Sequence, residues 1–253
     1  MVDSDDDMNL LSTLREEEDN NILIQDPKPK EGDELKTNHY HLQSINTALL
    51  LRQLPSQGLS FQLWPAANTL VSLLDHNPSK LLFPDPSTPA AAKLRILELG
   101  SGTGLVGIAA AAVLGARVTL TDLPHVLPNL RFNAQSNASA IASNGGEIEV
   151  RQLRWGEEED MDGLNAFDVV MASDVVYYDH LFEPLLRTVE VFVKGEVGFV
   201  MAHLRRWKKR DAVFFRKARK LFDVVVLHND APLPGSRIGV VVYRFTAKKA
   251  KKR

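Results

Sequence analysis

The stretch from Leu94 to Gly107 reads LRILELGSGTGLVG: a short apolar strand, three glycines in five positions, and the start of an apolar helix. Glycines at 100, 102 and 104 allow positive φ and leave no Cβ in the way of a ligand. The helix that follows points unpaired N–H groups into the turn. The unit predicts a site for a nucleotide-like ligand, although a glycine cluster alone also ends strands for structural reasons.

Seven short apolar runs follow from this point onward, most of them separated by helical patterns. We predict strands at 94–99, 117–121, 148–151, 168–172, 197–202, 223–227 and 238–245. The runs are continuously apolar, as expected of strands buried on both faces. The segment that joins the last two is too short for a helix, so the final strand should return antiparallel. The sequence therefore predicts an α/β, Rossmann-like, doubly wound seven-stranded sheet with an antiparallel last strand.

A small N-terminal β-hairpin is predicted ahead of this sheet, with strands near 49–54 and 59–64. Pro65 sits where a first helical turn accepts proline, and the helix it begins should end at Asn77. The four prolines within 78–93 predict a surface loop.

Polar and aromatic side chains stand just past several predicted strands, at the edge where a doubly wound sheet binds its ligand. Asp122 follows the second strand, about 20 positions after the glycine loop, where an acid accepts hydrogen bonds from ribose hydroxyls. Its alternative role is an N-cap for the next helix. Trp155 follows the third strand and could stack on adenine, or be an ordinary core or surface anchor. Asp174 and Tyr177 follow the fourth strand and could face a substrate, unless Asp174 only caps a helix.

An ordered set of motifs carries a resemblance to a known family. In chain order the motifs are WPAA from Trp64, ELGSGTGLVGIAAA from Glu98, TD at 121–122, LRWG from Leu153 and DVVY from Asp174. Together they resemble the seven-strand S-adenosylmethionine-dependent methyltransferases. More narrowly, the chain resembles the methyltransferase-like-21 group of non-histone protein-lysine N-methyltransferases. The resemblance covers roughly 59–245, and the ordered set is far more specific than any single motif.

The resemblance implies roles for the matching positions. The S-adenosylmethionine cofactor would contact Trp64, Glu98, Gly100, Ser101, Gly102, Thr103, Gly104, Asp122, Trp155 and Ser173. Asp174 and Tyr177 would be the catalytic pair that lines the lysine entrance. Many relatives carry alanine before that aspartate, whereas this chain carries Ser173, which is small enough to keep the same main-chain contact.

The expected chemistry is methyl transfer without a metal. The cofactor carries its own activated methyl group, so the protein mainly has to position donor and acceptor and exclude water. The seven histidines show no clustered ligand spacing. A lysine must lose its proton before attack, and a nearby carboxylate opposes that loss. We therefore assign Asp174 to binding and orienting the lysine, and Tyr177 to orienting the amine or narrowing the opening.

Charge is unevenly distributed along the chain. The net charge is −2, but residues 1–38 hold 12 acids and 4 bases, which leaves a positive balance for the rest. We predict an acidic disordered tail over 1–38, a methyltransferase domain over 39–246 whose hairpin extension spans 39–64, and a basic tail over 247–253.

Three other functions share part of this pattern. A nicotinamide-dependent oxidoreductase has the same glycine turn and acid, but the Trp155 motif and the antiparallel hairpin argue against it. A nucleic-acid amino-methyltransferase has prolines after the fourth strand, where this chain reads SDVVY. A non-catalytic module could bind protein or RNA through residues 205–220, with nine bases and one acid. Helical spacing of the apolar residues there favours instead a helix with a solvated basic face.

The expected partner is a protein with a target lysine, and the expected state is a monomer. Nucleic acid is not an expected substrate, and no apolar run is long enough for a membrane span. The N-terminus resembles neither a secretory nor a mitochondrial signal, and cysteine is absent. These features predict a cytoplasmic location, with the basic tail as a candidate nuclear import signal.

Overall fold

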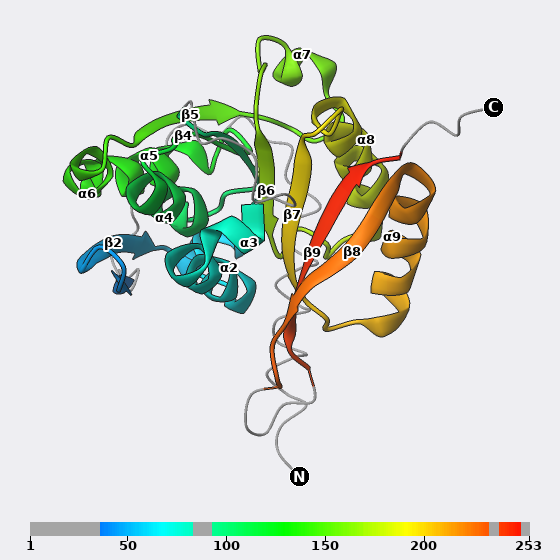
Figure 1. The fold of residues 1–253 in the computed structure, drawn as a ribbon, viewed down its shortest axis with the longest axis horizontal. Coiled ribbons are helices and arrows are strands. Elements are labelled where there is room, and N and C mark those ends of the chain that lie inside the picture. Colours follow the sequence, from blue (N-terminus) through cyan, green and yellow to red (C-terminus); the bar gives the residue numbers. More distant parts are fainter. Residues whose placement is uncertain (1–35, 83–92, 233–237, 249–253) are drawn as a thin grey trace.

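A seven-stranded sheet lies at the centre of the computed structural model, which describes residues 36–82, 93–232 and 238–248 (Figure 1). Each predicted strand is present within two residues of its predicted ends. The strands are β3 (Arg95–Leu99), β4 (Arg117–Asp122), β5 (Glu147–Gln152), β6 (Val169–Ser173), β7 (Gly198–Leu204), β8 (Phe222–Asn229) and β9 (Val240–Ala247).

The strand order is β5-β4-β3-β6-β7-β9-β8, and β9 runs antiparallel to both of its neighbours. The predicted doubly wound sheet with an antiparallel last strand is therefore confirmed. Successive side chains of a central strand enter opposite cores, as Ile96 and Leu97 do. Continuous burial does not extend to the two edges: β5 is half-buried, and Val225 and Val226 of β8 are exposed.

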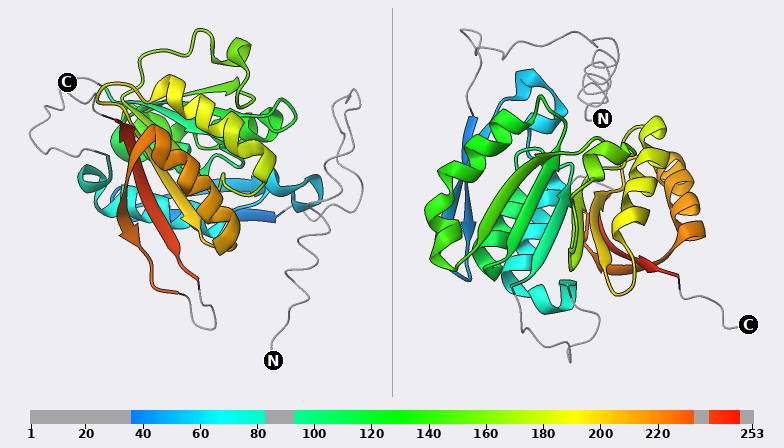
Figure 2. Two further views of the ribbon diagram at one scale, coloured as in Figure 1. Left: turned by 90° about the vertical axis from the view of Figure 1, so that its right-hand side faces the viewer. Right: turned by 90° about the horizontal axis from the view of Figure 1, so that it is seen from above.

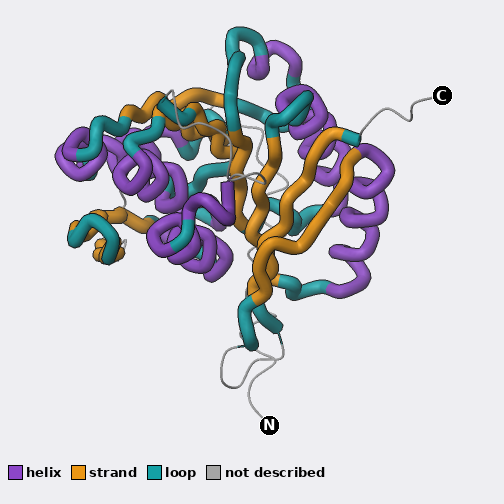
Figure 3. The backbone as a smooth tube through the Cα atoms, viewed as in Figure 1, coloured by secondary structure: helices purple, strands orange, loops and turns teal. Residues whose placement is uncertain are grey.

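Helices cover both faces of the sheet, which gives three layers (Figures 2 and 3). One face packs against α2 (Pro65–His76), α3 (Pro78–Leu82), α4 (Leu105–Leu114), α5 (Leu127–Ser136) and α6 (Ala138–Ser143). The other packs against α7 (Glu158–Met161), α8 (Phe182–Phe192) and α9 (Lys208–Leu221). The described residues also form the short 3-10 turns η2 (Pro55–Gln57), η3 (Leu59–Phe61) and η4 (Asp179–Leu181).

The N-terminal hairpin exists, and its strand predicted near 49–54 is present, but the partner strand predicted at 59–64 was wrong. It is formed by β1 (Lys36–Leu42) and β2 (Thr47–Gln53), which pair antiparallel. Residues 59–61 form the 3-10 turn η3 instead of a strand, with Phe61 buried and its carbonyl accepting the N–H of Leu54 at 3.0 Å. The predicted tail boundary at residue 38 also lies too late, since β1 begins at Lys36; the preceding residues lie outside the described part of the chain.

Two asparagine side chains, one within α5 and one at its C-cap, attach this hairpin to the domain. Asn137 accepts the N–H of Leu50 and donates to its carbonyl, both at 2.8 Å. Asn133 does the same with Arg52, at 2.8 and 3.1 Å, and also donates to the carbonyl of Thr103 at 2.9 Å. Two amides thereby satisfy backbone groups along β2. They tie the hairpin to the glycine loop, and so fix the segment that leads from β2 to α2.

The helix predicted from Pro65 is confirmed, and Asn77 is its C-cap. The surface loop predicted for 78–93 is wrong at its start, where α3 forms and buries Leu81 and Leu82. The proline at the start of α3 occupies a position that tolerates it in a helix. Residues 83–92 lie outside the described part of the chain.

Candidate active site

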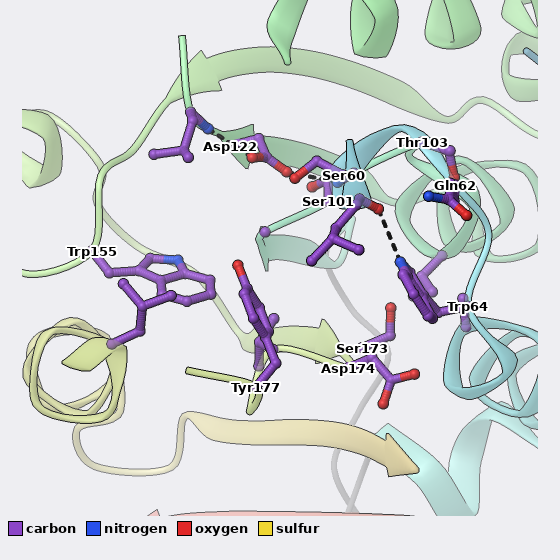
Figure 4. A pocket seen from close by; sticks show the side chains of 18 of the residues that line it. Ser60, Gln62, Trp64, Ser101, Thr103, Asp122, Trp155, Ser173, Asp174 and Tyr177 are labelled. Atoms are coloured by element: carbon purple, nitrogen blue, oxygen red, sulfur yellow. Dashed lines mark hydrogen bonds between the residues drawn. The ribbon is translucent and has the colours of Figure 1, made fainter. Parts of the chain in front are cut away.

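A cavity of about 250 Å³ opens at the carboxyl ends of β3, β4 and β6 (Figure 4). Ten of the twelve predicted site residues line it: Trp64, Gly100, Ser101, Gly102, Thr103, Asp122, Trp155, Ser173, Asp174 and Tyr177. These residues come from segments far apart in the sequence. The topology of the sheet therefore brings the residues of the separate sequence motifs together around one cavity.

The glycine loop between β3 and α4 is enclosed so closely that side chains are excluded at two positions. A Cβ on Gly100, whose φ is +61°, would stand 2.9 Å from Cζ2 of Trp155. A Cβ on Gly102, with φ +55°, would stand 3.0 Å from the carbonyl oxygen of Ser60. Left-handed backbone and lack of space both require glycine here. The loop can therefore present bare backbone to a ligand in the cavity.

Asp122 is a nearly buried acceptor fixed at the end of β4. One carboxylate oxygen accepts the N–H of Gly102 and the other that of Leu123, both at 2.7 Å. Burial raises the pKa of Asp122, and the two N–H groups offset part of that rise. The next helix, α5, begins at Leu127 with Val126 as its N-cap, so the capping role is excluded. Each oxygen keeps a lone pair for a donor in the cavity.

Glu98 and Gly104 are not among the residues that line the cavity, so their contact with the cofactor stays a prediction. Glu98 shares the strand parity of Ile96, so its side chain points under α4, where it accepts the N–H of Gly107 at 3.0 Å. Gly104 is the left-handed N-cap of α4, with φ +85°. Both residues lie at the start of α4, where the first backbone N–H groups of the helix have no intrahelical partner. The carboxylate of Glu98 satisfies one of them, the N–H of Gly107.

Glu98→Gln is expected to stabilise the protein in alkaline solution more than in acid. Burial raises the pKa of Glu98 from its ordinary value of 4.5 to about 8. Between these values the unfolded chain has lost a proton that the folded protein keeps, so this group lowers stability as pH rises through the window. Glutamine cannot ionise and keeps an acceptor for Gly107. Thermal unfolding at pH 5 and pH 8.5 should show the gain of the variant growing with pH; an equal difference at both pH values would contradict it.

Aromatic side chains form the walls of the cavity (Figure 4). Trp155 stands against Gly100, and Trp64 lies on the opposite side, where its Nε1–H donates to the carbonyl of Leu59 at 3.0 Å. Tyr177 lies between them, and its ring centroid is 4.9 Å from that of Tyr178. Flat apolar surfaces of this kind can enclose a planar ring and keep water from a reacting centre.

Asp174 follows β6 in an unusual backbone conformation. Its φ is +54°, in the left-handed region that few residues other than glycine adopt. Its N–H donates to the carbonyl of Ala202 at 2.9 Å, and its Oδ1 accepts the N–H of Leu204 at 2.9 Å. The side chain is 3% exposed, and Arg206 donates to its Oδ2 at 3.2 Å. Such strain at a residue that lines a cavity is typical of a functional site.

Four polar residues of the cavity were missed by sequence reasoning: Ser60, Gln62, Arg154 and Arg206. Ser60 and Gln62 were interpreted as part of a strand. Arg206 was interpreted as part of a basic helix. It lies two residues past the end of β7, and residues just past a strand end were the candidates at the other strands. Helix α9 begins only at Lys208.

Two further classes of feature are absent from the described residues. No group of three histidine or acidic side chains there lies close enough together to hold a metal ion. None of the helices within these ranges combines the length and apolar character needed to cross a membrane.

Solved structures of methyltransferases share this fold. A predicted O-methyltransferase from Agrobacterium tumefaciens superposes with a TM-score of 0.52 at 22% identity, over 74% of this chain and 82% of its own. A human methyltransferase 10 domain containing protein superposes with a TM-score of 0.50 at 11% identity, over 73% and 84%. At these identities the likeness concerns the fold alone.

Sequence relatives are more specific. The zebrafish (Danio rerio) protein N-lysine methyltransferase METTL21A is 35% identical over 156 residues, or 62% of this chain and 67% of its own length. The mouse (Mus musculus) protein-lysine methyltransferase METTL21E is 33% identical over 164 residues, or 64% and 62%. The match thus spans about two thirds of each relative or less. A family model described as lysine methyltransferase matches residues 43–221. The predicted resemblance is confirmed, and the chain belongs to the lysine methyltransferase family.

Proposed function

We propose that this chain transfers the methyl group of S-adenosylmethionine to the side-chain amine of a lysine in a protein. One observation carries the proposal: Asp122, at the end of β4, and Asp174, just past β6, line the same cavity, with the bare glycine loop beside them. The names of the zebrafish and mouse relatives, both lysine methyltransferases, support the choice of lysine.

The residues of the cavity fit the cofactor. Gly100 and Gly102 have no room for a Cβ, which leaves backbone accessible. Asp122 offers two oriented oxygens to hydroxyl donors, as ribose requires, and Trp155 offers a flat face to adenine. When bound, S-adenosylmethionine supplies an activated methyl group on a positively charged sulfur.

The residues after β6 are proposed to receive the lysine. Asp174 can accept an N–H of the incoming amine, because each of its oxygens has one bond in the structure and two lone pairs. Tyr177 narrows the same part of the cavity. The lysine nitrogen would accept the methyl group as a neutral amine, with the sulfur as leaving group, and its extra proton would pass to solvent. Holding the two reactants in line is the main contribution of the protein.

The substrate is proposed to be a non-histone protein in the cytoplasm. The resemblance to the methyltransferase-like-21 group supports the first part, and a chain free of cysteine is compatible with the second. No observation favours the non-catalytic module, because Asp122, Asp174 and the glycine loop all line the cavity.

Asp122→Ala is expected to weaken binding of S-adenosylmethionine and S-adenosylhomocysteine by ~10- to 100-fold, the effect of losing a hydrogen bond to a charged group. Isothermal titration measures both affinities, with NAD as a ligand that should not bind. Asp75→Ala is the matched control: Asp75 is also buried and accepts two backbone N–H groups, at 2.7 and 3.1 Å, but lies outside the cavity. Equal affinities for wild type and Asp122→Ala would contradict the proposed cofactor site.

A further inference from the structure

Arg206 extends from the end of β7 into the active-site cavity. Its Nη2 lies 3.2 Å from Oδ2 of Asp174, and its guanidinium carbon lies 5.0 Å from the ring centroid of Trp64. The side chain is 19% exposed. Arg206 therefore contacts both the residue proposed to receive the lysine and Trp64, whose indole face holds the guanidinium in place.

This ion pair bears on a difficulty in the chemistry. A free lysine has a pKa near 10.4, and a lone carboxylate beside it favours the charged ammonium, which has no lone pair with which to attack. Asp174 is nearly buried, so solvent screens its charge poorly. Without a cation of the protein beside it, this carboxylate would hold the substrate in its unreactive form.

We propose that Arg206 is a positioning residue that neutralises Asp174, so that Asp174 orients the incoming lysine as a neutral amine. The inference rests on the proposed function and assigns a task to a residue outside the recognised motifs. In this arrangement Arg206 takes one lone pair of Oδ2, the N–H of Leu204 takes one of Oδ1, and the remaining lone pairs face the amine.

The other charged groups near Asp174 are placed differently. His203 of β7 is buried, with Nδ1 3.7 Å from Oδ1 of Asp174, and its Nε2 lies 3.1 Å from the buried Asp211 of α9. His203 thus lies between two carboxylates, those of Asp174 and Asp211. The other ionisable groups that line the cavity are Asp122, Arg154, which is paired with Asp160, and Tyr177, whose carbonyl accepts from Arg210, itself paired with Asp179. Of the described arginines and lysines, Arg206 is the one in an ion pair with Asp174.

The test compares the pH dependence of methyl transfer by wild type, Arg206→Gln, Arg206→Lys and Arg216→Gln. Arg216 is an exposed arginine of α9 outside the cavity and serves as the matched control. The probe is tritiated S-adenosylmethionine with the proteins of a heat-treated cell extract, and the rate is measured in the lysine residues that the wild type labels. Isothermal titration of S-adenosylhomocysteine shows in parallel whether each variant keeps a folded cofactor site.

The methyl-transfer rate of Arg206→Gln is expected to rise with pH about one pH unit later than that of the wild type. The variant should therefore be about tenfold slower than the wild type at pH 7.5 and close to it above pH 10. Arg206→Lys should restore most of the rate at pH 7.5, because it restores the charge. Arg216→Gln should follow the wild type.

Two outcomes would overturn the inference while leaving the proposed function in place. An Arg206→Gln profile identical to wild type would show that the charge has no effect. A variant faster at every pH would show that Arg206 obstructs the lysine instead. These outcomes differ from a failure of the proposed function, in which the wild type itself would label no lysine at any pH. That result would contradict the role of Arg206 as well.

Discussion

Gly100→Ala should lower the affinity for S-adenosylhomocysteine by about 100-fold, or 2.7 kcal/mol. The new Cβ would meet Trp155 at 2.9 Å and Val175 at 3.2 Å, in a backbone conformation with φ +61° that alanine avoids. Relief of the contact requires either the loop or the indole to move, and both line the cavity. Isothermal titration measures the loss, and thermal unfolding checks that the variant is folded.

Gly195→Ala is the matched control for this substitution. Gly195 has the same φ of +61°, but no neighbouring atom lies within 4 Å of its added Cβ. The control carries the same backbone strain without the contact in the cavity. Similar affinities for the two variants would mean that the close approach of Gly100 and Trp155 does not shape the cofactor site.

Asp174→Asn should reduce methyl transfer by about 100-fold or more and leave S-adenosylhomocysteine affinity nearly unchanged, the range expected when a positioning contact at the reacting centre is lost. The asparagine keeps an oxygen for the N–H of Leu204, so the local backbone is preserved. Its neutral amide cannot form the ion pair with Arg206 and offers fewer acceptors to a lysine. Single-turnover transfer to lysine separates this effect from product release.

Asp179→Asn provides the comparison for that measurement. Asp179 lies five residues further along the same segment and is largely exposed, where it pairs with Arg210 at 2.8 Å. Loss of an exposed ion pair has little effect on stability. Full turnover by Asp174→Asn, or an equal loss in Asp179→Asn, would be incompatible with the assigned role of Asp174.

The sheet could be predicted because its central strands are buried on both faces and therefore read as continuous apolar runs. The antiparallel last strand followed from the short connection before it. Of the two hairpin strands, β2 was predicted, whereas β1 could not be placed, because it reads KTNHYHL and lacks an apolar pattern. Backbone groups of β2 are satisfied by Asn133 and Asn137, more than 80 positions away, which local sequence does not reveal.

The site was predictable wherever a motif and a strand end coincided, as at Asp122 and Asp174. Strand ends alone do not decide which residues reach the cavity where the direction of a side chain matters. Glu98 lies one residue before the end of β3, and strand alternation turns it under α4 instead of into the cavity. Arg206 was not predicted as a site residue, although it lies just past the end of β7. It belongs to a run of basic residues that predicted a solvated helix, whereas α9 begins only at Lys208.

Lysine in a protein is proposed to be the methyl acceptor. To identify the acceptor, the chain is incubated with tritiated S-adenosylmethionine and a cell extract, the labelled protein is hydrolysed to amino acids, and the methylated products are separated. We expect the tritium in mono-, di- or trimethyllysine, and its loss with Asp174→Asn. Label in methylarginine, methylhistidine or nucleic acid, or no label while S-adenosylhomocysteine still binds, would contradict the claim.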